Sequence, residues 1–376
     1  MTPRSVALFA LAVAGLSFSG CFSPSADDTT YAEMGFDGTH WPDLHGATVV
    51  VLDHGAFDYT FGPAKERFEA LTNGTLEHIA AQDTGDALNR AIREKGRPSF
   101  DVVYGLDNAY LGTAIASGAL QPYTPLLAPR VNASYVFFGD IQPWPATPVD
   151  HGYIAVNLDT RVNLTIADLG DLREHANEFA TQDPRTSSPG LGFLLATIAT
   201  FPEGSAMYDW HDYWQDLFAN GVTITSDWTT AYTQHFTGGY GQWEDGFVGS
   251  KPLVTSYSTS PAYELYYGGT DENQLVLAPK ATFHQVETVA IAANARELAG
   301  AQAFVEFVLT DGFQDLHAEL NAMYPVVDGI DVAKVYNHTD PAPGSFQSTE
   351  PDYQTLAANV ERWVREWTDL YEAHQA

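Results

Sequence analysis

The chain has 376 residues, of which 45% are hydrophobic and 13% aromatic, with 31 Gly and 21 Pro. This length suggests about two domains, and the composition excludes a disordered, collagen-like or membrane-bundle protein. Lys and Arg number 17 against 48 Asp and Glu, so the net charge is 17 − 48 = −31, which repels nucleic-acid phosphates and argues against nucleic acid as a partner.

The acidic residues are spread along the whole chain rather than gathered in one tail. A large negative charge keeps a protein soluble in concentrated salt, where self-repulsion is screened, and it also attracts cationic ligands. Charge alone does not separate these two interpretations. On the first of them, the composition resembles that of proteins from salt-loving organisms.

Residues 1–20 have the pattern of a signal peptide. Arg4 precedes an apolar run over residues 6–16, which is shorter than the roughly 20 residues that a membrane-spanning helix needs. The next segment ends in Ser-Gly before Cys21, the single cysteine, and resembles a lipoprotein processing box. We therefore expect Cys21 to carry a lipid anchor, with unlipidated cleavage as the alternative because Phe18 stands where an aliphatic residue is usual.

Residues 21–45 are rich in Ser, Asp, Thr, Gly and Pro and predict a tether. Four glycosylation sequons follow along the exported chain, and they do not discriminate between functions: Asn73, Asn132, Asn163 and Asn337.

The folded part begins with alternating strand and helix patterns. A buried-strand run covers residues 48–52, and further short strands are predicted at 76–79 and 100–104. Helices are predicted at residues 63–71, 87–95 and 108–117. This β-α-β-α-β-α order predicts a parallel sheet with helices on both faces.

A second α/β unit follows a Pro-rich stretch over residues 122–148. Its predicted elements are a strand at 153–158, helices at 190–200, 207–220 and 229–236, a strand at 286–293 and helices at 296–310 and 353–371. We expect residues 46–150 with 285–330 to form one lobe, 151–284 the other, and 331–376 a C-terminal helical segment. Ligands usually bind in the cleft between such lobes.

The mature chain lacks a nucleophile elbow, a His-Glu-x-x-His helix, a phosphate-binding loop and a dinucleotide fingerprint. His284 and Glu287 are three apart on a predicted strand and would point to opposite faces. The only cysteine lies at the export boundary. We therefore expect no catalytic residue, no metal site and no cofactor.

Four segments carry the most specific pattern: VYGLDN at 103–108, QDPRTSSPGLG at 182–192, DWTTAY at 227–232 and SYSTSPAY at 256–263. In this order and spacing the chain resembles the thiamine-binding substrate-binding proteins of thiamine ABC importers. The resemblance implies a two-lobed type II periplasmic-binding-protein fold, α/β in class, and an extracytoplasmic, monomeric, non-enzymatic protein that captures thiamine or a thiamine phosphate for a permease.

The resemblance also implies ligand contacts. Thiazolium is a permanent cation and favours aromatic faces, for which Trp228, Tyr257 and Tyr263 are the candidates; each is otherwise an ordinary core aromatic. Asp83 and Asp107 follow strands and either contact the aminopyrimidine or cap the next helices.

Further contacts are expected at the start of the helix at 190–200 and near the first strand. Ser188 and Pro189 are predicted as its N-cap and first helical residue. The resemblance implies that Ser187 contacts the ligand. Arg185 either adds charge there or forms a structural ion pair. His54 stands where the family has a tyrosine.

Two further departures bear on the ligand. Ala322 stands where the family usually has a tryptophan that stacks on the ligand. An insertion at residues 238–246 either supplies the lost aromatic side chain or is a surface loop.

One alternative function remains within the same fold. Tyr266 and Tyr267 resemble the iron-ligating pair of ferric-ion-binding transport proteins, since phenolate is a hard donor. A thiamine-degrading enzyme of this fold would need a cysteine nucleophile in the cleft, which Cys21 does not supply.

Overall fold

The computed structural model describes residues 40–55, 57–239, 249–276, 282–332 and 351–376. The signal peptide, Cys21 and residues 21–39 of the predicted tether lie outside these residues, as does most of the insertion at 238–246. Residues 40–45, the end of the predicted tether, are described, and Trp41 and Leu44 are buried in the hydrophobic core. In the described ranges no helix combines the length and apolar character needed to cross a membrane.

The predicted β-α-β-α-β-α start is confirmed. Its elements, with one short added strand, are β1 (Thr48–Asp53), α2 (Asp58–Thr72), β2 (Thr75–Ala80), α3 (Thr84–Glu94), β3 (Val102–Asp107), α4 (Leu111–Ser117) and β4 (Leu120–Gln121). Strand β1 pairs in parallel with both β2 and β3. Asp83 caps α3 through its side chain, and left-handed Asn73 and Gly118 end α2 and α4.

A later part of the chain returns to these elements. It contributes α9 (Leu298–Phe307), α10 (Asp311–Asn321) and β11 (Tyr324–Pro325). The sequence pattern predicted one helix over 296–310 and missed α10, which begins afresh where the Thr310 hydroxyl accepts a bond from the backbone of Phe313. We call this group of elements the first lobe.

The second lobe contains a further set of helices and strands from the middle of the chain. They are α5 (Leu169–Glu174), β6 (Phe179–Gln182), α6 (Ser188–Thr200), α7 (Trp210–Ala219), β7 (Thr223–Thr225), β8 (Leu253–Tyr257), α8 (Ser260–Tyr263) and β9 (Asn273–Leu275). The predicted helix at 229–236 is a π-helical segment, Thr230–His235, and a second one covers Glu264–Gly268. Short 3₁₀ turns cover residues 128–130, 133–135 and 176–178.

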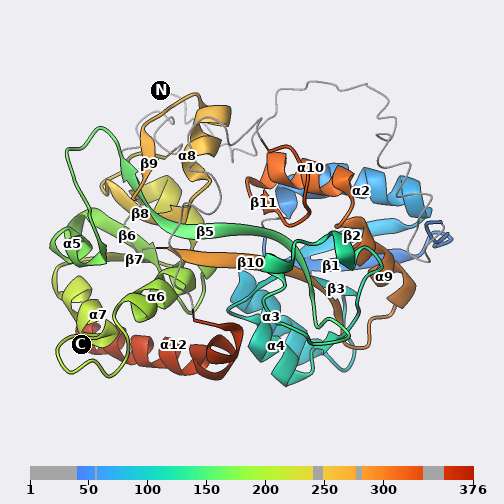
Figure 1. Cartoon of the computed structure of the whole chain (residues 1–376), viewed down its shortest axis with the longest axis horizontal. Coiled ribbons are helices and arrows are strands. Elements are labelled where there is room, and N and C mark those ends of the chain that lie inside the picture. Colours follow the sequence, from blue (N-terminus) through green and yellow to red (C-terminus); the bar gives the residue numbers. More distant parts are fainter. Residues whose placement is uncertain (1–39, 56, 240–248, 277–281, 333–350) are drawn as a thin grey trace, which may run out of the picture.

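Two long strands join the lobes. Strands β5 (Thr147–Asp159) and β10 (Phe283–Ala292) are antiparallel neighbours in a sheet of order β2-β1-β3-β10-β5-β8-β6-β7. Figure 1 shows them running side by side across the middle of the molecule, with one lobe at each end. The predicted boundaries at residues 150 and 285 fall inside these strands, so the chain passes between lobes within the sheet.

The C-terminal helix α12 (Tyr353–Gln375) packs against both lobes along one side (Figure 1). Trp367 is fully buried and meets Trp214 of α7 edge to face, with ring centroids 5.4 Å apart. At its other end, α12 places Ala357 directly over Gly112 of α4. The helix therefore ties the outer helices of the two lobes together.

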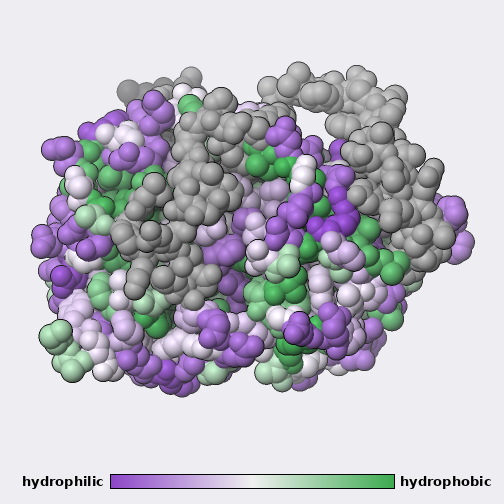
Figure 2. All heavy atoms as spheres, in the orientation of Figure 1, coloured by the Kyte–Doolittle hydropathy of each residue, from purple (hydrophilic) through white to green (hydrophobic). Residues whose placement is uncertain are grey.

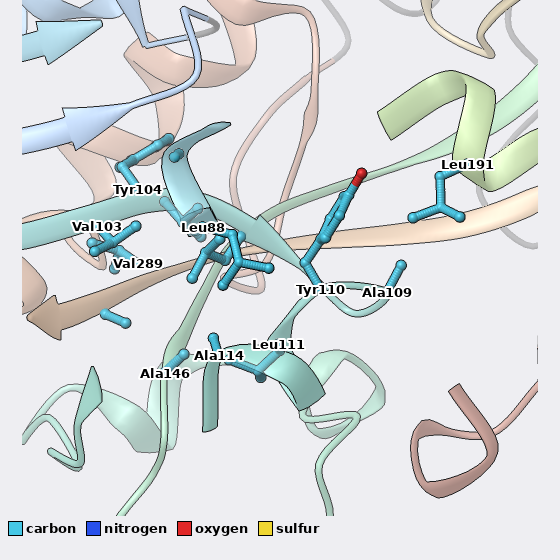
Figure 3. Close-up of a cluster of buried hydrophobic side chains, with 14 of the residues drawn as sticks. Leu88, Val103, Tyr104, Ala109, Tyr110, Leu111, Ala114, Ala146, Leu191 and Val289 are labelled. Carbon is cyan, nitrogen blue, oxygen red and sulfur yellow. The ribbon is translucent and has the colours of Figure 1, made fainter. Parts of the chain in front are cut away.

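The hydrophobic core continues from one lobe into the other. In Figure 3 the side chain of Tyr110, at the start of α4, rises toward α6, which carries Leu191. On the visible face, Figure 2 shows hydrophilic residues interspersed with small hydrophobic patches over both lobes, as expected for a chain of net charge −31.

Candidate functional site

Three buried carboxylates lie in one row across the strands that join the lobes. Glu287 on β10 is opposite Asp107 on β3 and opposite Asp150 on β5. Their exposed fractions are 2%, 2% and 0%. Asp107 accepts hydrogen bonds from Gln285 Nε2 at 2.9 Å and from the backbone of Ala109. Strand register therefore concentrates negative charge where the two lobes meet.

Two histidines contact this row: His317 Nε2 lies 2.7 Å from Oδ2 of Asp150, and His54 contacts Glu287. His54 follows β1, and its Nε2 lies 3.2 Å from Oε2 of Glu287. The ring lies against the backbone of Gly105, where a Cβ atom would come within 1.8 Å of it. Gly105 has φ +89°, so position 105 needs glycine both for its backbone and for the close approach of the imidazole.

The charges of this pair follow from their surroundings. Burial by itself lowers the pKa of His54, but Glu287, Asp53 and Asp150 outweigh it and raise this pKa to about 9. Burial and then the charge of Asp150 raise the pKa of Glu287. Burial also raises the pKa of Asp107. The row is thus held by a buried imidazolium and favours a cation beside it.

Aromatic side chains of the second lobe approach the same place. Trp228 is half-buried, stacks on Tyr232 at 4.8 Å and donates from Nε1 to Ser256 Oγ at 2.9 Å. Tyr257, at the end of β8, lies 6.4 Å from Trp228 between ring centroids. Burial raises the pKa of Tyr257 well above its usual range, and the charges of Glu287 and Asp107 raise it further. Tyr257 therefore links the aromatic pair to the carboxylate row.

Tyr263, in α8, lies at another edge of the junction. Burial and then the neighbouring Tyr59 of α2 raise its pKa to about 12. The two tyrosines come from opposite lobes, so Tyr263 lies close to the first lobe rather than deep in the second.

The starts of α3 and α6 meet where the lobes touch. Asp83 accepts a bond from Asp86 N at 2.8 Å as the N-cap of α3. Ser187 is the buried N-cap of α6 and makes no side-chain capping bond, so the prediction that Ser188 caps this helix is wrong by one residue. The extended backbone at position 187 (φ −125°, ψ 127°) starts the helix earlier. Ser188 Oγ donates to Thr84 Oγ1 at 2.7 Å across the junction.

Tyr110 belongs to this junction and was missed by the sequence analysis. Its hydroxyl is buried with no hydrogen-bond partner among the described residues. Burial and the charges of Asp107, Asp83 and Asp183 raise the pKa of Tyr110 far above its usual range. A buried hydroxyl of this kind is costly unless something supplies a partner. Its only sequence signal was its place three residues after Asp107.

The other missed residue is Glu287. A glutamate within the apolar strand sequence FHQVETVAIA was a usable signal, since buried carboxylates are rare without a role. The prediction that Glu287 and His284 point apart agrees with their partners: Glu287 meets His54, whereas His284 Nε2 lies 3.2 Å from His151 Nδ1.

Several other sequence alternatives are resolved by contacts. Arg185 bonds the carboxylate of Asp183 at 2.5 Å and lies over Trp367, 5.9 Å from the ring centroid, so it is a structural ion pair. Asp83 caps its helix through Oδ1, and Asp107 bonds the turn before α4 through Oδ1; these bonds do not decide whether either carboxylate also contacts a ligand. Ala322 has a left-handed backbone (φ 54°) at the end of α10. The methyl group of Met323 lies against Gly152, near the ring of Tyr257.

The tyrosine pair lies in the π-helical segment Glu264–Gly268. Tyr266 packs against the small cluster formed by Ala262 and Tyr324. The side chain of Tyr267 is outside the described residues. Two hollows in the described surface contain none of the candidate residues. One is lined by Tyr123 and Pro143 and the other by Glu77 and Arg296.

No protein-family model matches the chain. It is 32% identical over 324 residues to the thiamine-binding periplasmic protein of Escherichia coli K12, covering 85% of this chain and 91% of that protein. The thiamine-binding periplasmic protein of Brucella suis biovar 1 is 29% identical over 333 residues, with the same coverage.

Solved structures agree in fold. A periplasmic thiamin binding protein superposes with TM-score 0.71 at 29% identity, covering 87% of this chain and 97% of that one. Iron-bound HitA from Pseudomonas aeruginosa has TM-score 0.68 at 16% identity, covering 85% and 99%. The second likeness shows the fold alone.

Proposed function

Because the chain belongs to the family of periplasmic thiamine-binding proteins, we propose that it captures thiamine or a thiamine phosphate outside the cytoplasm and delivers it to an ABC importer. The two-lobed type II periplasmic-binding-protein fold expected from the sequence is confirmed by the solved relatives.

One observation carries the choice of ligand class. A row of buried carboxylates, Asp107, Glu287 and Asp150, acts electrostatically on Tyr257 of the second lobe, whose ring centroid is 6.4 Å from that of Trp228. Thiazolium carries a permanent positive charge, so an anionic row and aromatic faces both favour it, each aromatic face by roughly 0.5–2 kcal/mol. A metal cation would instead need several converging oxygen or nitrogen donors.

We assign the contacts as follows. Trp228, Tyr257 and Tyr263 contact the thiazolium, and Asp83 and Asp107 bind the aminopyrimidine amine and ring nitrogens. Ser187, at the start of α6, binds the hydroxyethyl group or its phosphate ester. His54 supplies a hydrogen-bonding plane. Glu287 and the Tyr110 hydroxyl are added to this set by the geometry described above.

Binding closes the lobes. Strands β5 and β10 carry both the inter-lobe connection and two of the carboxylates, so a ligand that contacts Trp228 and Asp107 at once touches both lobes. Its affinity is greater for the closed form, which shifts the population toward that form. The closed form then presents both lobes to the permease.

We further propose that the protein is a monomer that performs no chemistry and is anchored through a lipid on Cys21. An anchor keeps the protein near its permease and raises its effective concentration there. Mass spectrometry of Cys21 in membrane fractions tests the anchor, and light scattering tests the monomer. Incubation with thiamine followed by chromatography tests the absence of catalysis, because pyrimidine and thiazole products would contradict it.

The ligand is tested on protein that has been unfolded and refolded in high salt to remove carried-over ligand. Tryptophan fluorescence is then followed with thiamine, its mono- and diphosphate, and Fe(III). Saturable binding of a thiamine form supports the proposal and ranks the forms. No response to any of them, with visible colour from Fe(III), would favour the tyrosine pair instead.

A matched pair of variants separates the site from general stability. Glu287→Gln removes a charge beside the ligand and should weaken thiamine binding about 10- to 100-fold, the equivalent of a charged hydrogen bond. Glu306→Gln is the control, since Glu306 is equally buried but bonds Tyr123 and the backbone of Leu126. Equal loss in both variants would remove Glu287 from the site.

A further inference from the structure

A second group of chemically active side chains lies on the first lobe, outside the candidate ligand residues. Asp53 ends β1, Asp58 begins α2 and His78 lies on β2. One ligand atom from each comes within 4.8 Å of the other two. His78 Nδ1 lies 2.9 Å from Oδ2 of Asp53 and 3.3 Å from Oδ1 of Asp58. Two carboxylates from separate elements therefore converge on one ring nitrogen.

The neighbours hold these groups in place. The other oxygen of Asp53 accepts a bond from Gly55 N at 2.7 Å, which leaves Oδ2 for His78. Phe61 stacks on the imidazole with ring centroids 4.0 Å apart, and this fixes the ring plane. Asp53 is fully buried, whereas the Asp58 side chain is 53% exposed. The group is fixed on the protein side and open on the solvent side.

The arrangement is better suited to a metal ion than to a proton. One Nδ1 proton cannot bond two carboxylates well, because each bond needs its own direction. Ligand bonds of about 2.0–2.1 Å in a tetrahedral Zn²⁺ site imply ligand-to-ligand distances of about 3.3 Å. The 3.3 Å from Nδ1 to Oδ1 of Asp58 matches that value, and the 2.9 Å to Oδ2 of Asp53 is somewhat shorter. Imidazole with two carboxylates also suits first-row divalent ions better than Ca²⁺ or Mg²⁺, which prefer oxygen ligands.

We propose that Asp53, Asp58 and His78 bind one first-row divalent cation, with Zn²⁺ as the best fit, and that solvent completes its coordination. Two carboxylates balance the charge of the ion. Apart from the iron alternative at Tyr266 and Tyr267, the sequence predicted no metal site, because these three residues come from separate elements. The β1–β2 pairing brings Asp53 and His78 together, and α2, which follows β1, supplies Asp58. None of the three ligands is among the proposed thiamine contacts, although Asp53 directly precedes His54 in the chain.

The test uses the chelator-treated whole protein in high salt, which screens weak binding to the acidic surface. Co²⁺ is titrated while its visible absorption is followed, and Zn²⁺ is then added as competitor. We expect one equivalent of Co²⁺ to bind, with a tetrahedral spectrum, and Zn²⁺ to displace it. A hundredfold excess of Mg²⁺ or Ca²⁺ should leave the spectrum in place, with about one equivalent still bound.

Variants locate the ion. His78→Gln should weaken Co²⁺ binding about 100-fold or more, since even groups that only orient a ligand contribute about 10- to 100-fold. Asp58→Asn, at an exposed position, should weaken it at least about tenfold. His211→Gln is the matched control: His211 also contacts two carboxylates, Asp209 and Glu366, but through opposite ring nitrogens.

Three results would overturn the proposal: no stoichiometric Co²⁺ or Zn²⁺ binding, wild-type binding by Asp58→Asn, or displacement of Co²⁺ by a hundredfold excess of Mg²⁺ or Ca²⁺. Circular dichroism of each variant shows whether it is folded. Thiamine titration of the same samples reports on the other site, so failure of one proposal is distinguishable from failure of the other.

Discussion

The charge of the His54 and Glu287 pair predicts how stability depends on pH. The folded-state pKa of His54 is raised to about 9 from its ordinary 6.5. A raised histidine pKa stabilises the folded state fully below the unfolded value, and this contribution is lost as pH rises through the folded value. The difference of about 2.5 units corresponds to about 3 kcal/mol of unfolding free energy, lost between about pH 6.5 and 9.

The assay is denaturant unfolding of chelator-treated protein at several pH values in high salt, with wild type and His54→Gln in parallel. The chelator keeps Asp53 free of a cation, which would change the charge beside His54. Glutamine does not titrate, so the variant should lose most of the decline of about 3 kcal/mol between about pH 6 and 9.5. His211→Gln, at a part-exposed histidine, should keep the wild-type profile. If His54→Gln declines as steeply as wild type, the buried imidazolium does not stabilise the carboxylate row and the electrostatic account of the site fails.

Three other changes test separate parts of the structure. Tyr110→Phe removes a hydroxyl that has no partner within the described ranges, so calorimetry should show thiamine binding about 2- to 10-fold weaker while the melting temperature does not fall; a lower melting temperature with unchanged affinity would contradict its role. Trp228→Ala should weaken thiamine binding about 2- to 30-fold with the fold intact, as one cation–π face is worth; unchanged affinity would remove Trp228 from the site. Gly112→Val places a Cβ about 2.5 Å from that of Ala357 and should lower the unfolding free energy by about 1–3 kcal/mol in urea; wild-type stability would mean that α12 does not pack tightly on α4.

The sequence predicted the local pattern of the fold well, because β1 and β3 are largely apolar and short strand patterns alternate with helical ones. It was weaker where tertiary contacts decide. Residues 229–236 have helical periodicity, yet they form a π-helical turn that places Tyr232 under Trp228. Strand β5 begins earlier than predicted, with Asp150 and His151 buried among its first residues. Polar residues at these positions hide the strand from any search for apolar runs.

The residues of the candidate site also differ in how well the sequence predicted them. Trp228, Tyr257 and Ser187 lie in motifs long enough to be found by resemblance. Glu287 does not, because its importance comes from register: only the pairing of β10 with β3 and β5 places it beside Asp107 and Asp150. Tyr110 was hidden for a related reason, since an unpartnered hydroxyl is a property of the packed structure and has no counterpart in sequence.

The position of the carboxylate row also bears on how ligand binding and lobe closure are coupled. Asp150 and Glu287 lie on the two strands that connect the lobes, and the aromatic rings lie on the second lobe. A cation between them is attracted to both sides at once, and burial on closure removes water and strengthens that attraction. A neutral ligand of the same shape would gain only the packing. A ligand shifts an equilibrium by no more than its difference in affinity for the two states, so the charge of the thiazolium, more than its size, should drive closure.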